Sequence, residues 1–228
     1  AAPKEAIYGL LPEFCERLSG FSADEGLRYD LVTSHYWLSG LVGQHLRHAW
    51  GVPHVTSFHT LAEIKRRARP GESEVPQRVD KEREIATTAD LIVAWSLHER
   101  DAIVNYYGAP PERVAIIPPG VDTNRFRPLD QAQCRAKLGI GGERVLLYVG
   151  RLERLKGVDI LLRAMSQLEH SAGVKLLIIG GSANSPELAR LQRVAKDLRI
   201  DGQVRFLGTV PHTQLPVYYN AADVCVLP

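Results

Sequence analysis

The sequence predicts an α/β protein made of two halves, each built on a parallel sheet. Short β-branched runs alternate with segments of helical period along the whole chain, an order typical of Rossmann-like domains. Proline and glycine cluster near the middle, at Pro118-Pro119-Gly120 and again at Gly139-Ile140-Gly141-Gly142, as in a linker between compact units. We therefore expect one domain at residues 1–128 and a second at residues 129–228.

The first half is expected to open on an amphipathic helix. Its apolar residues recur at helical spacing and share one face: Ile7, Leu10, Leu11, Phe14 and Leu18. β-branched runs then predict strands at residues 29–33, 52–58, 90–94 and 113–117. Between these strands, helical periodicity predicts helices at residues 37–50, 75–88 and 97–107.

The second half repeats this order after a short helical piece. Strands are expected at residues 145–149, 175–179, 204–207 and 224–227, with helices centred on Leu161, Leu191 and Tyr218. The first half has no strand before its opening helix, and the sequence ends at Leu227-Pro228, where a strand would pass to its loop. Both domains are therefore expected to be incomplete at these ends.

Composition narrows the functional class. The chain has 228 residues, of which 45% are hydrophobic, and 28 basic side chains nearly balance 26 acidic ones. This balance argues against a nucleic-acid partner.

The sequence holds no apolar run of ~18 residues, so no transmembrane segment is expected. Three widely spaced cysteines suggest neither a disulfide framework nor a zinc site: Cys15, Cys134 and Cys225. A cytoplasmic protein is expected, and a homo-oligomer is compatible with this sequence.

The segment from Val145 to Gly157 predicts an anion site. A buried strand ends at Gly150, two cations follow at Arg151 and Lys156, and an amphipathic helix then begins. The free N–H groups and dipole of a helix N-terminus favour an anion, and arginine can bind phosphate oxygens through two donors. The alternative is a solvated surface loop.

Polar side chains also follow two strands of the first half. His35 and Tyr36 come after one expected strand, and His59 and Thr60 come after the next. Because parallel strands end at the same edge of a sheet, these side chains are expected to approach one crevice. The alternative is that both histidines are ordinary residues at strand ends. Three other histidines lack partners at metal-ligand spacing: His45, His48 and His54.

Gly180-Gly181-Ser182 follows a further expected strand. The glycines, Gly181 in particular, allow the backbone to approach a ligand closely, or they simply form a tight turn. The sequence lacks a dinucleotide fingerprint, a Walker loop and the motifs of hydrolases and kinases. Without an obvious nucleophile, chemistry that depends on positioning and electrostatics fits better than covalent catalysis.

Several of these stretches together resemble the retaining glycosyltransferases of family 4, which have the two-domain GT-B architecture. The motifs occur in family order: Tyr29 to Gly40, Phe58 to Leu61, Ile117 to Phe126, Gly150 to Gly157, Phe206 to Gly208 and Tyr219 to Asp223. The members that look most similar are the N-acetylglucosaminyltransferase that acts on inositol phosphate in mycothiol synthesis and the sucrose and sucrose-phosphate synthases. The chain resembles a middle portion of such an enzyme.

The resemblance implies a nucleotide sugar as donor, linked to uridine diphosphate, with no bound metal and no cofactor. Arg151 and Lys156 would hold the donor diphosphate and act in catalysis. Val210 would meet the base through its backbone, and Gly181 belongs to the same donor side. His59 would lie beside the donor sugar and orient it at the reaction centre.

The implied acceptor is a small sugar, polyol or sugar phosphate. Four positions match the motif residues that contact a phosphorylated acceptor: Lys4, Tyr36, Thr60 and Arg78. Two cations and two hydroxyl groups suit a sugar phosphate. The alternatives are a solvated terminus for Lys4 and a helical pair with Glu82 or Asp80 for Arg78.

The sequence also departs from the family pattern. It has no match to the glycine-rich loop after the first strand of the N-terminal domain, nor to the glutamate motif that binds the donor ribose and sugar. The resemblance therefore does not establish that this chain alone is active. Two other functions stay open: a nucleotide-sugar epimerase on the same architecture, and a non-catalytic fragment that binds a nucleotide or sugar.

Overall fold

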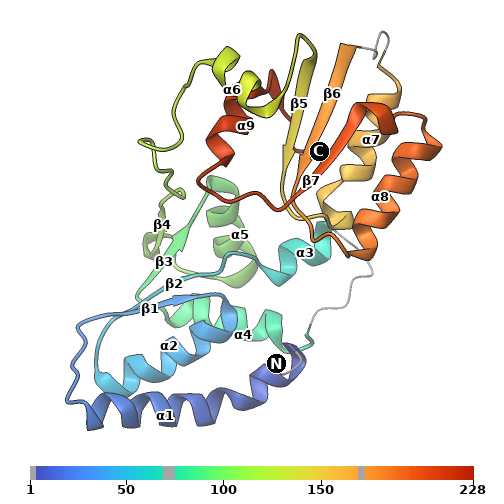
Figure 1. Ribbon diagram of the computed structural model, residues 1–228. Helices are drawn as coiled ribbons and strands as arrows, with labels where there is room; N and C mark the ends of the chain where they lie inside the picture. Colours follow the sequence, from blue (N-terminus) through green and yellow to red (C-terminus); the bar gives the residue numbers. More distant parts are fainter. Residues whose placement is uncertain (1–3, 69–74, 169–172) are drawn as a thin grey trace. The chain divides into compact units, whose positions relative to one another are not determined.

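Figure 1 shows the computed structural model of the chain, which describes residues 4–68, 75–168 and 173–228. The side chains of residues 4 and 5 lie outside this description. The chain divides into two compact units, unit 1 at Ala1–Gly120 and unit 2 at Val121–Pro228. The domain boundary after Pro128 stays a prediction.

Unit 1 contains a parallel sheet of four strands in chain order. The strands are β1 (Val32–His35), β2 (His54–Ser57), β3 (Leu91–Ala94) and β4 (Val114–Ile116), and their order in the sheet is β1-β2-β3-β4. The register pairs His35 with Ser57, so the carboxyl ends of β1 and β2 are level. The predicted strands are confirmed, although β1 begins at Val32 rather than at residue 29.

The helices of unit 1 follow the predicted order, with one addition. They are α1 (Leu11–Asp24), α2 (Trp37–Trp50), α3 (Ala62–Ala68), α4 (Arg78–Thr88) and α5 (Leu97–Tyr107), with 3-10 turns η1 (Lys4–Leu10) and η2 (Pro111–Arg113). The structure confirms both ends of the helices predicted at residues 37–50 and 97–107. Helix α3 was not predicted, because it is short and only its first residue, Ala62, is buried.

The ends of α5 show why its bounds could be predicted. The Ser96 side chain accepts a hydrogen bond from the backbone N–H of Glu99 at 3.1 Å, and the Glu99 carboxylate accepts one from the N–H of Trp95. This reciprocal pair satisfies two donors at the start of the helix. At the other end, Gly108 adopts a φ of 73°, a left-handed conformation that ends the helix.

The prediction for the first helix was wrong in part. Residues 4–10 form the 3-10 turn η1, and the α-helix begins only at Leu11, with Pro12 in its first turn. Three residues of the expected apolar face are exposed: Ile7, Leu10 and Phe14. Helix α1 packs through Cys15, with Leu11 and Leu18 beside it, against residues of β1 and α2. Unit 1 thus covers only part of the apolar surface of this helix.

Unit 2 contains a second parallel sheet, with the order β7-β6-β5-β8. Its strands are β5 (Arg144–Val149), β6 (Val174–Ile179), β7 (Val204–Gly208) and β8 (Val224–Cys225). The central strand β5 therefore has β6 on one side and β8 on the other, and the chain changes direction across the sheet at this point. In open α/β sheets, ligands bind outside the carboxyl ends of the strands at such a switch point.

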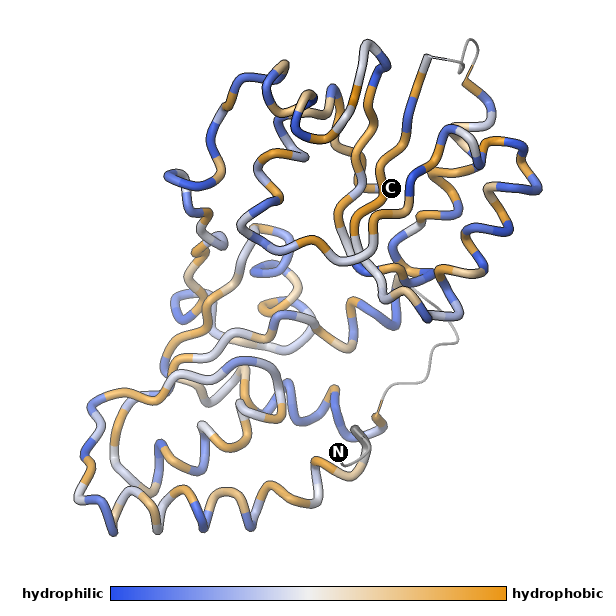
Figure 2. Tube along the Cα trace, in the orientation of Figure 1, coloured by the Kyte–Doolittle hydropathy of each residue, from blue (hydrophilic) through white to orange (hydrophobic). Residues whose placement is uncertain are grey.

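Helices cover both faces of this sheet. They are α6 (Gln131–Leu138), α7 (Val158–Ser166), α8 (Pro186–Asp197) and α9 (Leu215–Ala221), with 3-10 turns η3 (Arg154–Lys156) and η5 (Asp201–Gln203). Tyr148 and Leu176 pack with α7 and α8 on one face, while Leu147 and Leu177 pack with α9 on the other. Because both faces are buried, the strands are apolar over most of their length (Figure 2).

Helix α7 illustrates the packing. Its buried residues, Val158, Leu161, Leu162 and Met165, recur at helical spacing on the face toward the sheet. Burying each such side chain contributes roughly 1.5–3 kcal/mol. None of the helices in residues 4–68, 75–168 and 173–228 has the length and apolar character needed to cross a membrane.

Candidate functional site

The carboxyl ends of β5, β6 and β7 surround a hollow of about 240 Å³ in unit 2. Nine residues line it: Val149, Gly150, Arg151, Ile179, Gly180, Gly181, Thr209, Val210 and Leu215. Three predicted donor residues, Arg151, Gly181 and Val210, are therefore brought together at the carboxyl edge of the sheet, on the β6–β7 side of β5. The fourth, Lys156, is not one of the lining residues and is exposed at the end of η3.

Glycines let the backbone segments approach one another at this edge. The N–H of Gly150 donates to the carbonyl of Ile179 at 2.9 Å, and the N–H of Gly180 donates to that of Gly208 at 2.7 Å. Gly180 has a φ of 128°, and a Cβ atom there would collide with the carbonyl oxygen of Gly150. Glycine is therefore required at position 180 both by the backbone conformation and by the lack of space.

The Arg151 guanidinium is available to an anion. Its side chain is 76% exposed and forms an ion pair with Glu153 at 2.8 Å. An exposed pair of this kind contributes only about 0–1 kcal/mol, so a phosphate can replace Glu153 at little cost. The backbone carbonyl of Arg151 accepts a hydrogen bond from the Tyr148 hydroxyl at 2.9 Å, which fixes the start of the loop.

The N-terminus of α7 follows directly after Lys156. Gly157 caps it with a φ of 63° and contributes no side-chain hydrogen bond. Its first N–H groups thus lack the side-chain acceptor that commonly satisfies them. A cation and a helix N-terminus adjacent in sequence both favour a negatively charged ligand.

In unit 1, two histidines pair across the ends of β1 and β2. The Nδ1 atom of His35 lies 2.8 Å from the Nε2 atom of His59. The edge of the Trp95 ring, which follows β3, packs against His59 with ring centroids 4.4 Å apart. Burial, and next the adjacent His35, lower the pKa of His59 below its ordinary value. His59 therefore favours the neutral form, which can donate a hydrogen bond at one ring nitrogen and accept one at the other.

Two residues at these strand ends adopt uncommon backbone conformations. Tyr36 has a φ of 76° and His59 a φ of 60°, both in a region that L-residues rarely adopt. Each such residue costs about 1–3 kcal/mol, and such strain gathers at functional sites. Both residues were predicted from the sequence as site residues.

Arg78 lies behind the His59–Thr60 turn, with 1% of its side chain exposed. Its Nη2 atom donates to the carbonyl and the hydroxyl oxygens of Thr60, at 2.8 and 3.0 Å, and its guanidinium lies 5.0 Å from the centre of the Tyr36 ring. Its Nε atom donates to the carboxylate of Glu82 at 2.7 Å. Three predicted acceptor residues, Tyr36, Thr60 and Arg78, thus form one cluster.

Two further residues belong to this cluster: Glu82, which was expected only as the alternative helical partner of Arg78, and Tyr107, which was not expected. Glu82 is fully buried and also accepts a hydrogen bond from the Tyr107 hydroxyl at 2.6 Å. Burial raises the pKa of the Glu82 carboxyl, and burial, with the adjacent carboxylate, raises that of Tyr107. The i,i+4 spacing of Arg78 and Glu82 was a signal for their pairing, whereas nothing in the sequence connected Tyr107 to them. Lys4, the fourth predicted acceptor residue, has its side chain outside the described part of the chain.

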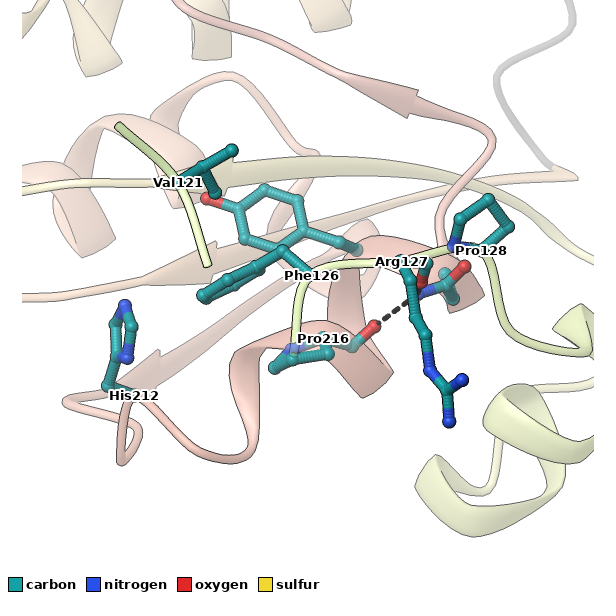
Figure 3. Close-up of a pocket in the computed structure, with 8 residues that line it drawn as sticks. Val121, Phe126, Arg127, Pro128, His212 and Pro216 are labelled. Carbon is teal, nitrogen blue, oxygen red and sulfur yellow. Dashed lines mark hydrogen bonds between the residues drawn. The ribbon is translucent and has the colours of Figure 1, made fainter. Parts of the chain in front are cut away.

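A second hollow of unit 2, of about 570 Å³, lies where residues 121–128 pack on α9 (Figure 3). Phe126 contacts the rings of His212 and Tyr219 edge to face. The Asn220 side chain donates to the carbonyls of Arg127 and Pro216 and accepts from the N–H of Leu129. These contacts anchor the segment to α9, so Asn220 of the Tyr219-to-Asp223 motif has a structural role.

Asp223 of the same motif is structural too. Its Oδ2 atom accepts hydrogen bonds from the N–H of Val145 at 2.6 Å and from the Arg135 guanidinium at 2.7 Å. The Val145 N–H is the main cause of the lowered pKa of the Asp223 carboxyl, to which Arg135 also contributes. The carboxylate thereby joins α6 and the end of α9 to the start of β5.

Comparison with known proteins places both units in glycosyltransferase families. The family model described as Glycosyltransferase Family 4 matches residues 2–125, and the one described as Glycosyl transferases group 1 matches residues 130–228. The D-inositol 3-phosphate glycosyltransferase 1 of Catenulispora acidiphila is 39% identical to this chain over 236 residues. The match covers 99% of the chain and 56% of that relative, so the chain spans little more than half of its length.

Solved structures agree on the fold. The sucrose-phosphate synthase of Thermosynechococcus elongatus has a TM-score of 0.86 and 31% identity, over 100% of this chain and 57% of that one. Anabaena Alr3699/HepE in complex with UDP has a TM-score of 0.77 and 21% identity, over 93% of this chain and 56% of that one. The second likeness concerns the fold alone. Together they confirm the predicted pair of Rossmann-like α/β halves of GT-B type.

Proposed function

The chain belongs to glycosyltransferase family 4, and we propose that it carries donor-side and acceptor-side elements of an enzyme that transfers a hexosyl group from a nucleotide diphosphate sugar to a small acceptor. The observation that carries this proposal is the hollow at the ends of β5, β6 and β7, where Arg151, Gly181 and Val210 meet. An exposed guanidinium, a close backbone approach and a neighbouring helix N-terminus suit a diphosphate.

The proposed donor is linked to uridine diphosphate. Arg151 binds the diphosphate through its guanidinium in place of Glu153, and Lys156 adds a second positive charge. The backbone at Val210 contacts the base. UDP is the ligand named for the Anabaena structure, which supports this choice of nucleotide at the level of the fold.

The proposed acceptor is a phosphorylated polyol or sugar. The relative from Catenulispora acidiphila is named for D-inositol 3-phosphate, and its match covers 99% of this chain. The hydroxyl groups of Tyr36 and Thr60 give directional hydrogen bonds, and Arg78 supplies the positive charge. Because 1% of the Arg78 side chain is exposed, its charge acts on the phosphate from behind Thr60 rather than by direct contact.

We propose transfer with retention of the anomeric configuration. The bond between the sugar C1 atom and the diphosphate oxygen breaks, and a bond from C1 to an acceptor hydroxyl forms on the same face. The hydroxyl proton passes to the departing diphosphate oxygen. Arg151 and Lys156 stabilise the negative charge that grows on the diphosphate, and neutral His59 orients the donor sugar. No metal and no cofactor take part in this scheme.

A binding panel and a product analysis test the proposal. Calorimetric titration of the 228-residue chain with UDP, ADP and GDP should give the tightest binding with UDP. Incubation of the full-length protein with UDP-glucose or UDP-N-acetylglucosamine and D-inositol 3-phosphate should yield an α-linked product, identified by the NMR coupling constant of its anomeric proton. Equal affinity for the three nucleotides contradicts the donor assignment, and a β-linked product contradicts retention.

A further inference from the structure

The turn that follows β2 is strained. The N–H of Thr60 donates to the carbonyl of Phe58 at 2.7 Å, which closes a three-residue turn around His59. With a φ of 60° at its centre, this turn belongs to the rare class of γ-turns. A conformation of this cost persists only where its surroundings determine it. The contacts that hold the turn are therefore of functional interest.

Arg78 is the first of these contacts. Its Nη2 atom binds both oxygens of Thr60 on the C-terminal side of the turn, as described above. Its Nε atom binds the carboxylate of Glu82 one helical turn further along α4. Arg78 thus connects the strained turn to a fully buried carboxylate.

Glu82 connects the same carboxylate to the next element. Its Oε2 atom accepts a hydrogen bond from the backbone N–H of Ala62, the first residue of α3, at 2.9 Å. The Tyr107 hydroxyl donates to Oε2 and itself accepts a hydrogen bond from the N–H of Glu63 at 2.8 Å. The backbone N–H groups of Ala62 and Glu63 thus donate to Glu82 and Tyr107, respectively. Together with the bonds from Arg78 to Thr60, they connect both ends of the segment from Thr60 to Glu63 to one buried hydrogen-bond network.

The buried hydrogen-bond network of Arg78, Glu82 and Tyr107 depends on each of its three side chains. A hydrogen bond to a charged group inside a protein is stronger than a neutral one, and removing one partner leaves the others buried without a partner. The Tyr107 ring itself is held separately, by stacking on Phe58 with centroids 6.4 Å apart. The hydroxyl can therefore be removed while the packing of the ring is kept.

We propose that Glu82 and Tyr107 are positioning residues of the acceptor-side site: through Arg78 and the start of α3 they hold the His59–Thr60 turn in the conformation that receives the acceptor. Neither residue needs to touch a ligand, since Glu82 is fully buried and Tyr107 almost so. The identity of the acceptor rests on the proposed function, whereas the holding of the turn does not.

The test uses Tyr107→Phe, with Tyr106→Phe as its matched control. Tyr106 is the preceding residue of α5, and its ring lies on the surface, where it stacks under Arg67. The conformation of the turn is read from the nuclear Overhauser contacts between the His59 and Trp95 rings. The site is read from the dissociation constants of D-inositol 3-phosphate and of UDP.

We expect Tyr107→Phe to weaken or abolish the ring contacts and to weaken D-inositol 3-phosphate binding about tenfold, with UDP binding unchanged. Tyr106→Phe should match the parent in all three measurements. Glu82→Gln, which keeps the shape but removes the negative charge and replaces one acceptor oxygen by an NH2 donor, should show the same changes as Tyr107→Phe, and more strongly.

The outcomes separate the two proposals. If Tyr107→Phe and Glu82→Gln lower only the stability to urea, while the ring contacts and both affinities stay at parent values, the two residues are merely structural and the inference is wrong. If the parent fails to bind D-inositol 3-phosphate but the ring contacts are lost in the variants, the positioning role stands and the proposed acceptor is wrong.

Discussion

His35 and His59 share a single hydrogen bond, 2.8 Å from Nδ1 to Nε2, between residues that are 24 positions apart in the sequence. The bond exists because β1 and β2 are parallel neighbours in level register, so that each strand delivers its histidine to the same edge. One of the two rings must donate and the other accept, which favours a state in which they do not both carry a full positive charge.

Replacing His35 should therefore raise the pKa of His59. In His35→Ala the repulsion from the second imidazole is lost, but burial remains, so the pKa of His59 should rise while staying below its ordinary value. NMR titration of the His59 Hε1 resonance measures this directly. His98→Ala, an exposed histidine on α5, serves as control. A His59 pKa that falls or does not change in His35→Ala speaks against the pairing.

A second histidine makes the stability of unit 1 depend on pH. His54 is fully buried, with Nε2 bonded to Ser34 at 2.7 Å, and its Nδ1 atom has no partner among the described residues. Burial is the main cause that lowers its pKa to about 4, and Arg47 lowers it further. Protonation would bury a charged ring with an unsatisfied N–H group, so the folded state resists it.

The sign of the effect follows from proton binding. Between the ordinary pKa of 6.5 and the folded value of about 4, the unfolded chain binds a proton at His54 that the folded chain does not. The free energy of unfolding should thus fall by roughly 3 kcal/mol as the pH falls through this range, at 1.36 kcal/mol per pKa unit. The hydrogen bond with Arg47 is the main cause that lowers the pKa of Asp90 to about 2. The stabilisation that Asp90 provides is therefore lost only at pH values below those at which His54 acts.

Urea unfolding at pH 7.0, 5.5 and 4.5 tests this prediction. The parent should lose stability steeply over the series, while His54→Gln should show a flatter dependence. The comparison concerns slopes, since the substitution itself changes the stability at every pH. If the free energy of unfolding depends on pH equally steeply in the parent and in His54→Gln, His54 is not the cause of the pH dependence.

Gly180 should tolerate no side chain. A Cβ atom at this position meets the carbonyl oxygen of Gly150 and requires a φ of 128° from an L-residue. Gly180→Ala should lower the free energy of unfolding by about 3 kcal/mol or more, the sum of backbone strain and overpacking. Gly202→Ala is the control, because a Cβ there has nothing within 4 Å. Similar urea midpoints for the two variants would mean that the backbone at Gly180 does not lie as close to the Gly150 carbonyl as the structure has it.

Much of the fold could be predicted because local and global signals agree. The apolar runs at β5 and β6 have buried residues on both faces of a parallel sheet, so the runs themselves marked these two strands. The order β7-β6-β5-β8 could not be derived in this way, because hydrophobic pattern does not specify which strands are neighbours. The exposed side of α1 was mispredicted for a related reason, since periodicity shows an apolar face but not what covers it.

The residues of the candidate site that follow strands could be predicted from the sequence. The buried contacts that hold these residues in place could not. Parallel strands end at one edge, so the residues after β1, β2 and β5 were natural candidates: Tyr36, His59, Thr60 and Arg151. The contact of Tyr107 with Glu82 joins two helices and depends on their packing, which leaves no local pattern. The burial of Arg78 likewise depends on the β2–α3 turn that folds over it.

We propose above that Arg151 and Lys156 bind the diphosphate of the donor at the end of β5. Calorimetric titration with UDP at low salt tests it with Arg151→Ala combined with Lys156→Ala. The control is Arg193→Ala combined with Lys196→Ala, two exposed residues of α8 whose removal changes the net charge equally. Losing two charge-assisted contacts of about 1.5–3 kcal/mol each should weaken UDP binding by about 100-fold or more, with the control close to the parent. A double variant at positions 151 and 156 that binds UDP as tightly as the control contradicts a diphosphate site at these two residues.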